Sequence, residues 1–312
     1  MNHPHILQIG SYPEWDQAPL DAAYTVHRYY EAADKAAFLA KVGPQVQAIA
    51  TRGDLGAGAE IISACPNLKL VAVYGVGYDA VDTAACRARG IAVTNTPGVL
   101  DGDCADLAVA MMLGLTRNVV QAEAWVRNGT WAKQGFPLQR RAFGKRAGIL
   151  GMGRIGAEVA KRLQGFDMQI AYSARSAKQV PFEYIPDPVA LAARSDFLFV
   201  TAAATAETRH VANAAVLNAL GPQGMLINIS RAGNIDEAAL LSALESGTLG
   251  GAALDVFEGE PNLNPRFLAL TNVMLQPHHA SGTYETRQAM GQLMRANLTA
   301  HFANQPLLTS VI

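Results

Sequence analysis

Short apolar segments alternate with longer alanine-rich segments of helical periodicity along most of the chain. The first four apolar segments are HILQIG, VQAIATRG, LKLVAVYGVG and IAVTNTPG. A second series comprises RAGILGMG, MQIAYSARS, DFLFVTAAA, MLINISRAG, GAALDVFEG and NVMLQPHHA. This alternation is typical of βαβ units, in which crossover helices join parallel strands. The pattern predicts an α/β protein with two Rossmann-like domains, each a doubly wound parallel sheet, and a cleft between them.

The domain boundaries follow from the two series of strands. A chain of 312 residues exceeds what one hydrophobic core usually supports. Residues 1–100 plus 284–312 are predicted to form a flavodoxin-like substrate domain, and residues 101–283 a dinucleotide-binding Rossmann domain. The C-terminal segment, from about Tyr284 to Asn304, is amphipathic and follows the final strand. It cannot extend the second sheet, so we expect it to pack on the first domain.

A long apolar helical segment, residues 101–129, joins the two series of strands. Its first residues include Asp101 and Asp103, and either carboxylate is a suitable N-cap for a helix that begins here. The apolar LAVAMMLGLTRN part of this helix is expected either to be buried between the domains or to lie in a homodimer interface.

Composition and charge exclude several classes of partner. Half of the residues are hydrophobic, 16% are charged and the formal net charge is −1, so neither nucleic acid nor an anionic membrane surface is an expected partner. The three cysteines, Cys65, Cys86 and Cys104, form neither a Cys-x-x-Cys motif nor a Cys/His cluster, and no metal site is expected. We read them as buried apolar side chains. The N-terminal segment lacks the features of a signal peptide, which predicts a soluble, cytoplasmic protein that acts on small molecules.

The segment GILGMGRIG carries a G-x-G-x-x-G motif directly after an apolar strand and at the start of a helical pattern. The first glycine permits a tight turn, the second lets the backbone approach a pyrophosphate, and the third lets helix and strand pack closely. Free amides at the helix N-terminus then bind the anion. The alternative is a merely tight turn, but the strand, turn and helix context favours a dinucleotide site. The predicted cofactor-binding residues of this loop are Gly151, Met152, Gly153, Arg154, Ile155 and Gly156.

The end of the next strand indicates which dinucleotide binds. NAD-binding proteins usually carry an acidic residue there for the ribose 2′-hydroxyl, whereas this chain has Ser173, followed by Arg175 and Ser176. A hydroxyl and a guanidinium can hydrogen-bond and neutralise a 2′-phosphate, which a carboxylate would repel. NADP is therefore predicted as the preferred cofactor, with NAD possible. Arg154 is equally well explained as a solvated helix residue.

Three polar residues follow later strands, at the edge where open α/β sheets place their active sites: Arg231, Glu260 and His278. An arginine can bind a carboxylate through two hydrogen bonds and polarise a neighbouring carbonyl. A glutamate beside a histidine favours the imidazolium and orients it as a proton donor. Each residue alone also has a structural explanation, as a surface ion pair, a loop carboxylate or a hydrogen-bonded histidine. Together with a nicotinamide site they indicate hydride transfer coupled to proton transfer.

Several long motifs, in order, resemble those of D-isomer-specific 2-hydroxyacid dehydrogenases. They are VYGVGYDAVD, GIAVTNTPGVL, ADLAVAMMLGLTRN, GMGRIG, INISRAGNIDEAALLSAL, GGAALDVFEGEP and LQPHHASGT, and they cover nearly the whole chain after about residue 45. Within that family the chain is similar to the NADP-dependent glyoxylate/hydroxypyruvate reductases, including the plant hydroxyphenylpyruvate reductase type. The resemblance implies an NADPH-dependent reductase of small 2-keto acids, and a homodimer.

The resemblance also implies roles for individual residues. Arg231 is expected to bind the substrate carboxylate and polarise its keto group, with His278 as the acid/base and Glu260 as its partner. Asp255 matches the aspartate that contacts the nicotinamide side of the cofactor. The loop that includes Val76 and Gly77 matches the one whose backbone amides hold the substrate carboxylate.

Alternatives remain open for the role of Arg52, for the size of the keto acid and for the function itself. Arg52, in the ATRGD segment after a strand of the first domain, either contacts substrate or is a solvent-facing loop arginine. Pocket size decides between a small keto acid and a bulkier aromatic one, and the sequence does not fix it. A nucleotide-sensing scaffold without catalysis is the alternative function, which the presence of Arg231, Glu260 and His278 together disfavours.

The two adjacent histidines of QPHHASGT are interchangeable by position alone, because neighbours in an extended segment point to opposite sides. The resemblance selects His278, the residue directly after Pro277, as the acid/base. His279 is then expected to line the pocket or pack beneath it.

Overall fold

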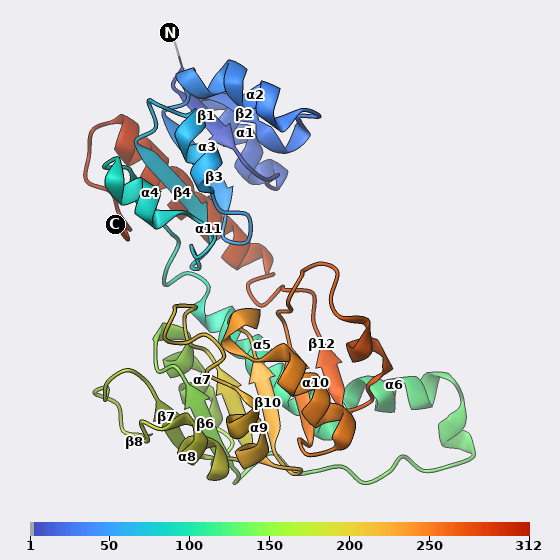
Figure 1. The fold of residues 1–312 in the computed structure, drawn as a ribbon. Coiled ribbons are helices and arrows are strands. Elements are labelled where there is room, and N and C mark those ends of the chain that lie inside the picture. Colours follow the sequence, from blue (N-terminus) through green and yellow to red (C-terminus); the bar gives the residue numbers. More distant parts are fainter. Residues whose placement is uncertain (1–2) are drawn as a thin grey trace. The chain divides into compact units, whose positions relative to one another are not determined.

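The computed structural model describes residues 3–312 and divides into two compact units. Unit 1 comprises the described residues up to Leu100 together with Gly282–Ile312, and unit 2 comprises Asp101–Ser281. Each unit contains a parallel sheet with helices packed around it, as predicted (Figure 1).

The sheet of unit 1 has the strand order β2-β1-β3-β4-β5, which is the flavodoxin-like doubly wound order. Its strands are β1 (His5–Gln8), β2 (Thr25–Arg28), β3 (Ala48–Arg52), β4 (Leu70–Tyr74) and β5 (Ala92–Thr94). Its α-helices are α1 (Glu14–Ala23), α2 (Lys35–Val42), α3 (Ala59–Ala64), α4 (Thr83–Ala88) and α11 (Tyr284–Phe302), with short 3-10 helices at Tyr29–Glu31 and Gly43–Gln45. Apart from their last residues, Arg52 and Tyr74, the central strands β3 and β4 consist of buried β-branched or aliphatic residues, as in a sheet covered on both faces.

Helix α11 completes unit 1 although it lies at the other end of the chain. It packs against β4 and α1. The Tyr74 hydroxyl, at the end of β4, donates a 2.6 Å hydrogen bond to the backbone oxygen of Arg287. The buried Asp16 carboxylate of α1 forms an ion pair with Arg295 of α11. Gly291 makes this approach possible, because a Cβ at that position would overlap the Asp16 carboxylate.

The sheet of unit 2 has the strand order β12-β11-β10-β9-β6-β7-β8. Counted from β6, this is the Rossmann order 3-2-1-4-5-6 with one further strand at the edge. The strands are β6 (Arg146–Leu150), β7 (Gln169–Ser173), β8 (Glu183–Tyr184), β9 (Phe197–Val200), β10 (Met225–Asn228), β11 (Gly251–Leu254) and β12 (Val273–Leu275).

The helices of unit 2 include the predicted crossovers. They are α5 (Asp101–Arg117), α6 (Val119–Arg127), α7 (Arg154–Gln164), α8 (Pro188–Ala193), α9 (Ala214–Leu220) and α10 (Glu237–Ser246), with 3-10 helices at Thr130–Ala132, Ala232–Asn234 and Pro265–Ala269. Leucine and valine side chains of β9, β10, α9 and α10 form one continuous core, to which Ile235 and Phe267 from the connecting segments also belong.

Three local expectations are corrected by the structure. The helix predicted over residues 101–129 is interrupted at Asn118, whose φ of 53° lies in the left-handed region. Asp101 and Asp103 both lie within the first turn of α5 rather than capping it, where their charge still complements the helix dipole. Strand β2 and helix α1 were not predicted, because β2 is a short polar edge strand and α1 contains Pro19.

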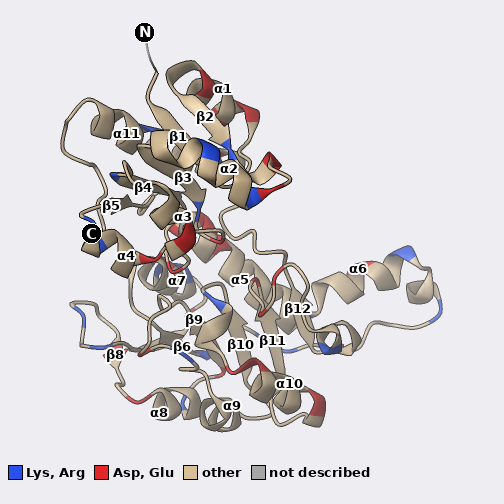
Figure 2. Cartoon of the chain, turned by 45° about the horizontal axis from the view of Figure 1, so that its top comes forward, with Lys and Arg blue, Asp and Glu red and all other residues tan. Residues whose placement is uncertain are grey.

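The three cysteines are free and buried, as expected. Within residues 3–312, no cluster of three or more His, Cys, Asp or Glu side chains is arranged to bind a metal ion. None of the helices in that range combines the length and apolar composition needed to cross a membrane. Basic and acidic segments are spread over both units (Figure 2).

Candidate active site

The glycine loop after β6 has the geometry of a dinucleotide-binding turn. Gly151 has a φ of 106°, and a Cβ there would lie 2.5 Å from the backbone of Ala202. A Cβ at Gly156 would lie 2.2 Å from the backbone oxygen of Gly151. In contrast, a Cβ at Gly153 would meet nothing within 4 Å. The first and third glycines are therefore required by packing, whereas the second leaves open space beside the backbone for a ligand.

Helix α7 begins directly after this loop. Gly153 is its N-cap and provides no side chain to accept from the first amides, which remain available to an anion. Met152 is buried beneath the loop, Ile155 is half-buried and Arg154 is exposed in the first turn. The Thr201 hydroxyl donates a 2.7 Å hydrogen bond to the Gly151 oxygen and fixes the turn. These residues fit the pyrophosphate of a dinucleotide.

The residues after β7 that were predicted to bind the 2′-phosphate differ from Ser173, the last residue of β7, in their exposure to solvent. Ser173 is buried, and its hydroxyl donates a 3.0 Å hydrogen bond to the backbone oxygen of Pro186. Arg175 and Ser176, by contrast, are exposed in the loop that follows. The groups available to a phosphate at this edge are therefore the guanidinium and the second hydroxyl.

Arg231 is positioned by two asparagines that the sequence analysis did not single out. Asn228, the last residue of β10, accepts hydrogen bonds from the backbone and hydroxyl of Ser230 and donates to the Arg231 oxygen. Asn234 is fully buried and donates to the Ala202 oxygen and the Ser230 hydroxyl. The sequence signal that could have identified Asn228 is a polar amide at the end of an otherwise apolar strand.

Asp255 follows β11 and is fully buried. Its two carboxylate oxygens accept hydrogen bonds from the backbone amides of His279 and Ala280, both at 2.9 Å. Burial raises the pKa of Asp255, and these two amides act in the opposite direction. The side chain thus holds the segment that directly follows β12 and carries both histidines.

His278 and Glu260 are in direct contact. Nδ1 of His278 lies 2.6 Å from Oε2 of Glu260, and Oε1 of Glu260 accepts a 2.8 Å hydrogen bond from the amide of Phe257. An ionised carboxylate can only accept, so Nδ1 carries the hydrogen and Nε2 is the nitrogen left for a ligand. His278 has a φ of 49°, a left-handed conformation that is uncommon outside glycine and frequent at functional sites.

The charges around Glu260 determine its protonation. Burial raises the pKa of this carboxyl, but the hydrogen bonds from His278 and Phe257 and the charge of Arg231 together lower it below its ordinary value. The structure therefore brings Arg231, Glu260 and His278 close enough together to interact, at the carboxyl ends of β10, β11 and β12.

His279 does not pack beneath the pocket, which was one of its two expected positions. Its side chain is exposed, and Nε2 lies 2.8 Å from Oε1 of Gln276. It neither packs beneath the segment nor contacts Glu260. The backbone amide of His279 is bound by Asp255, so the two adjacent rings point to different environments.

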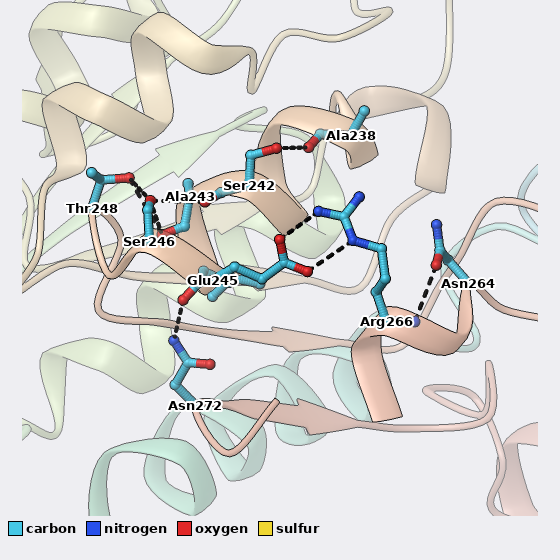
Figure 3. Close-up of polar contacts among 10 residues, drawn as sticks. Ala238, Ser242, Ala243, Glu245, Ser246, Thr248, Asn264, Arg266 and Asn272 are labelled. Carbon is cyan, nitrogen blue, oxygen red and sulfur yellow. Dashed lines mark hydrogen bonds and ion pairs between the residues drawn. The ribbon is translucent and has the colours of Figure 1, made fainter. Parts of the chain in front are cut away.

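The connection from β11 to β12, which carries Glu260, is anchored to α10 (Figure 3). Arg266 forms a two-point ion pair with Glu245, with 2.8 Å between Nε and Oε1. The Asn272 amide donates to the backbone oxygen of Leu244. Together these contacts fix the connection at positions beyond Glu260.

The predicted substrate-binding residues of unit 1 lie at the ends of neighbouring strands. Arg52 ends β3 and is paired in register with Tyr74, which ends β4. Val76 and Gly77 follow two and three residues later, and the Val76 oxygen accepts a 2.8 Å hydrogen bond from Asn95. The Arg52 guanidinium is held by Asp54, with 3.0 Å between Nε and Oδ1. This edge of the sheet is where doubly wound folds bind ligands.

The lowered pKa of Glu260 predicts a pH-dependent contribution to stability. The carboxylate is favoured in the folded state, so its stabilisation is present above the ordinary glutamate pKa of about 4.3 and is lost as the pH falls through the lower folded value. We expect Glu260→Gln to lower the melting temperature by roughly 2–6 °C at pH 7. The difference from wild type should narrow as the pH falls below about 4.

Glu258→Gln, at a neighbouring exposed glutamate, is the matched control; it removes a charge that repels Glu237, so it should not lower the melting temperature at pH 7. Equal melting temperatures for wild type and Glu260→Gln at pH 7 would contradict a stabilising interaction between Glu260 and His278.

Comparison with known proteins identifies the family of the chain. Residues 109–280 match the family model described as D-isomer specific 2-hydroxyacid dehydrogenase, NAD binding domain. Hydroxyphenylpyruvate reductase of Plectranthus scutellarioides is 44% identical over 308 residues, which cover 98% of each chain. Among solved structures, a 2-hydroxyacid dehydrogenase from Ketogulonicigenium vulgare is 65% identical with a TM-score of 0.94, covering 100% of this chain and 99% of that one.

A second solved structure is that of the NADPH-dependent glyoxylate/hydroxypyruvate reductase from Sinorhizobium meliloti in complex with NADP and malonate. It is 42% identical, has a TM-score of 0.94 and covers 99% of this chain and 97% of that one. The motifs, the two doubly wound sheets and these similarities lead to one conclusion. The chain belongs to the D-isomer-specific 2-hydroxyacid dehydrogenase family.

Proposed function

We propose that the protein is an NADPH-dependent reductase of small 2-keto acids such as glyoxylate and hydroxypyruvate. The observation that carries the proposal is the 2.6 Å contact between His278 and Glu260, close to Arg231 and in the same unit as the glycine loop. The solved relative from Sinorhizobium meliloti, described as an NADPH-dependent glyoxylate/hydroxypyruvate reductase, supports this substrate class.

In this proposal the bound dinucleotide supplies a hydride to the keto carbon. Arg231 binds the substrate carboxylate and polarises the keto oxygen through charge-assisted hydrogen bonds. Nε2 of His278 donates a proton to that oxygen, because Nδ1 is engaged by Glu260. Glu260 accepts a hydrogen bond from Nδ1 and so orients the ring. Asp255 holds the segment on which the ring is carried, and by family resemblance it also lies at the nicotinamide side of the cofactor.

The two units divide these tasks. Unit 2 is proposed to bind the dinucleotide through residues 151–156, and unit 1 to bind the substrate through Arg52 and the amides of Val76 and Gly77. The open space beside Gly153 supports the first assignment, and the position of Val76 and Gly77 after β4 supports the second.

Cofactor preference is proposed to depend on the loop after β7. The exposed guanidinium of Arg175 and hydroxyl of Ser176 suit a 2′-phosphate. The buried Ser173 hydroxyl instead donates a hydrogen bond to the backbone oxygen of Pro186. NADP is therefore proposed as the preferred cofactor, with NAD as a weaker alternative.

We further propose a homodimer formed through the α6 arm, residues 119–145. Figure 1 shows α6 extending away from the sheet of unit 2, with a long segment returning to β6. The arm exposes large apolar side chains that a single chain leaves uncovered: Val120, Val126, Trp131, Leu138 and Phe143. Such a surface is typical of a protein interface.

Light scattering should give the mass of two 33.1 kDa chains for the wild type. Trp131→Asp combined with Leu138→Asp should shift the protein towards a single chain, whereas Val189→Asp on α8 should not. A wild-type mass of one chain would contradict the dimer.

The free, buried thiols of the three cysteines support a reducing, cytoplasmic location, which is also proposed.

Similarity to hydroxyphenylpyruvate reductase favours a second candidate function, the reduction of a bulkier aromatic keto acid.

The direct test is NADPH oxidation, followed by absorbance, with glyoxylate, hydroxypyruvate and 4-hydroxyphenylpyruvate as substrates. We expect turnover with the first two and a higher kcat/KM with NADPH than with NADH. Oxidation of NADPH with none of these acids would contradict the enzymatic proposal.

In the same assay, Arg175→Ala should raise the KM for NADPH by roughly tenfold and the KM for NADH much less, because only NADPH carries the 2′-phosphate. Equal effects on both would exclude Arg175 as the phosphate ligand.

A further inference from the structure

Unit 1 contains a cavity of about 370 Å³ beside the proposed substrate loop. Its lining residues come from both ends of the chain and meet at the carboxyl ends of β1, β3 and β4 and at the start of α11. They include Tyr12, Trp15, Arg52, Tyr74, Tyr284 and Arg287. The volume falls in the range of small-molecule sites. Tyr74 directly precedes the loop of Val76 and Gly77, so the cavity adjoins the proposed substrate site within unit 1.

Aromatic rings form the walls of the cavity. Tyr12 stacks on Tyr74 with 5.3 Å between ring centroids, and Trp15 meets Tyr284 edge-on at 6.0 Å. The hydrogen bond from Tyr74 to the Arg287 backbone fixes the first turn of α11 against the first of these pairs. Packing therefore holds the Tyr12–Tyr74 wall without a ligand, whereas the side chains of Trp15 and Tyr284 are exposed.

The polar groups of the cavity are mainly hydrogen-bond donors. The Tyr12 hydroxyl is buried, and no group among residues 3–312 is placed to hydrogen-bond it. Burial and the neighbouring Tyr74 raise the pKa of Tyr12, so the phenol stays neutral and can donate. Arg287 lines the cavity, and no ion pair to it occurs within residues 3–312. The N-terminus of the 19-residue helix α11 adds positive partial charge.

The charge balance favours an anion. None of the described lining residues is acidic, and the carboxylate of Asp54 is already bound to Arg52, itself a lining residue. Arg287 therefore remains the uncompensated charge of the cavity. An uncharged aromatic group would fit the walls but would leave the buried Tyr12 hydroxyl without a partner, at a cost in free energy. An acidic group satisfies both the hydroxyl and the guanidinium.

We propose that this cavity binds a second acidic group at the far end of the keto acid, so that the enzyme also accepts dicarboxylic 2-keto acids. Arg287 is the residue that recognises this group, with Tyr12 as a further donor. The inference rests on the proposed function for its substrate class but concerns residues outside the group formed by Arg231, Glu260 and His278.

The kinetic test compares 2-oxoglutarate with 2-oxovalerate, which has the same number of carbons and no second carboxylate. Wild type should have a kcat/KM for 2-oxoglutarate roughly tenfold or more above that for 2-oxovalerate, as expected for a charge-assisted contact. Arg287→Met should abolish this ratio, and Arg287→Lys should restore part of it. Arg87→Met, which removes the same charge from an exposed position on α4, should leave the ratio unchanged.

A binding measurement separates this inference from the proposed function. Calorimetric titration of the protein with glutarate and with pentanoate needs no turnover, and glutarate should bind more tightly to wild type but not to Arg287→Met. If no keto acid is reduced but glutarate shows this preference, the cavity assignment stands and the reductase proposal fails. Equal binding of both acids, a ratio unaffected by Arg287→Met, or a higher kcat/KM for 4-hydroxyphenylpyruvate than for 2-oxoglutarate would overturn the assignment.

Discussion

The buried carboxylate of Asp255 is the constraint on which the candidate active site depends. It directly follows β11, is fully buried, and accepts hydrogen bonds from two successive backbone amides after β12. These hydrogen bonds fix the segment in which His278 has its left-handed conformation. As a result His278 meets Glu260, while the neighbouring His279 ring is exposed beside Gln276. A backbone contact, and not the chemistry of the imidazoles, distinguishes the two histidines.

The same principle of backbone anchoring recurs along the carboxyl edge of the unit 2 sheet. Asn228 and Asn234 hold the turn that carries Arg231, and Thr201 holds the glycine loop. Fixed hydrogen bonds of this kind orient polar side chains before a ligand arrives, which limits the reorganisation needed during the reaction. In unit 1 the equivalent role belongs to Tyr74, whose hydroxyl binds the first turn of α11.

Much of the fold could be predicted from the sequence, because buried parallel strands read as short apolar runs and crossover helices keep their periodicity. The exceptions have physical causes. Strand β2 is a polar edge strand, and the left-handed turn at Asn118 divides a helix that periodicity alone would continue. The Ser173 hydroxyl was expected to face the cofactor, but it is buried against Pro186, a contact made between segments that sequence spacing does not reveal.

The charged residues of the candidate site could be predicted from the sequence, but the residues that position them could not. Arg231, Glu260 and His278 stood out because charged residues after apolar strands face a cleft or an ion. The cavity around Tyr12 and Arg287 did not stand out, since its walls are assembled from the first and last parts of the chain. Such a site follows from tertiary packing alone.

The central claim is that Asp255 and Glu260 select His278 as the proton donor. Single-turnover oxidation of bound NADPH on mixing with hydroxypyruvate tests it most directly, in His278→Asn and His279→Asn. His278→Asn should slow the reaction by roughly 100-fold to 10,000-fold, the usual range for loss of a general acid, while His279→Asn should change it less than about threefold. A large loss in His279→Asn with a near-normal rate in His278→Asn would contradict the account.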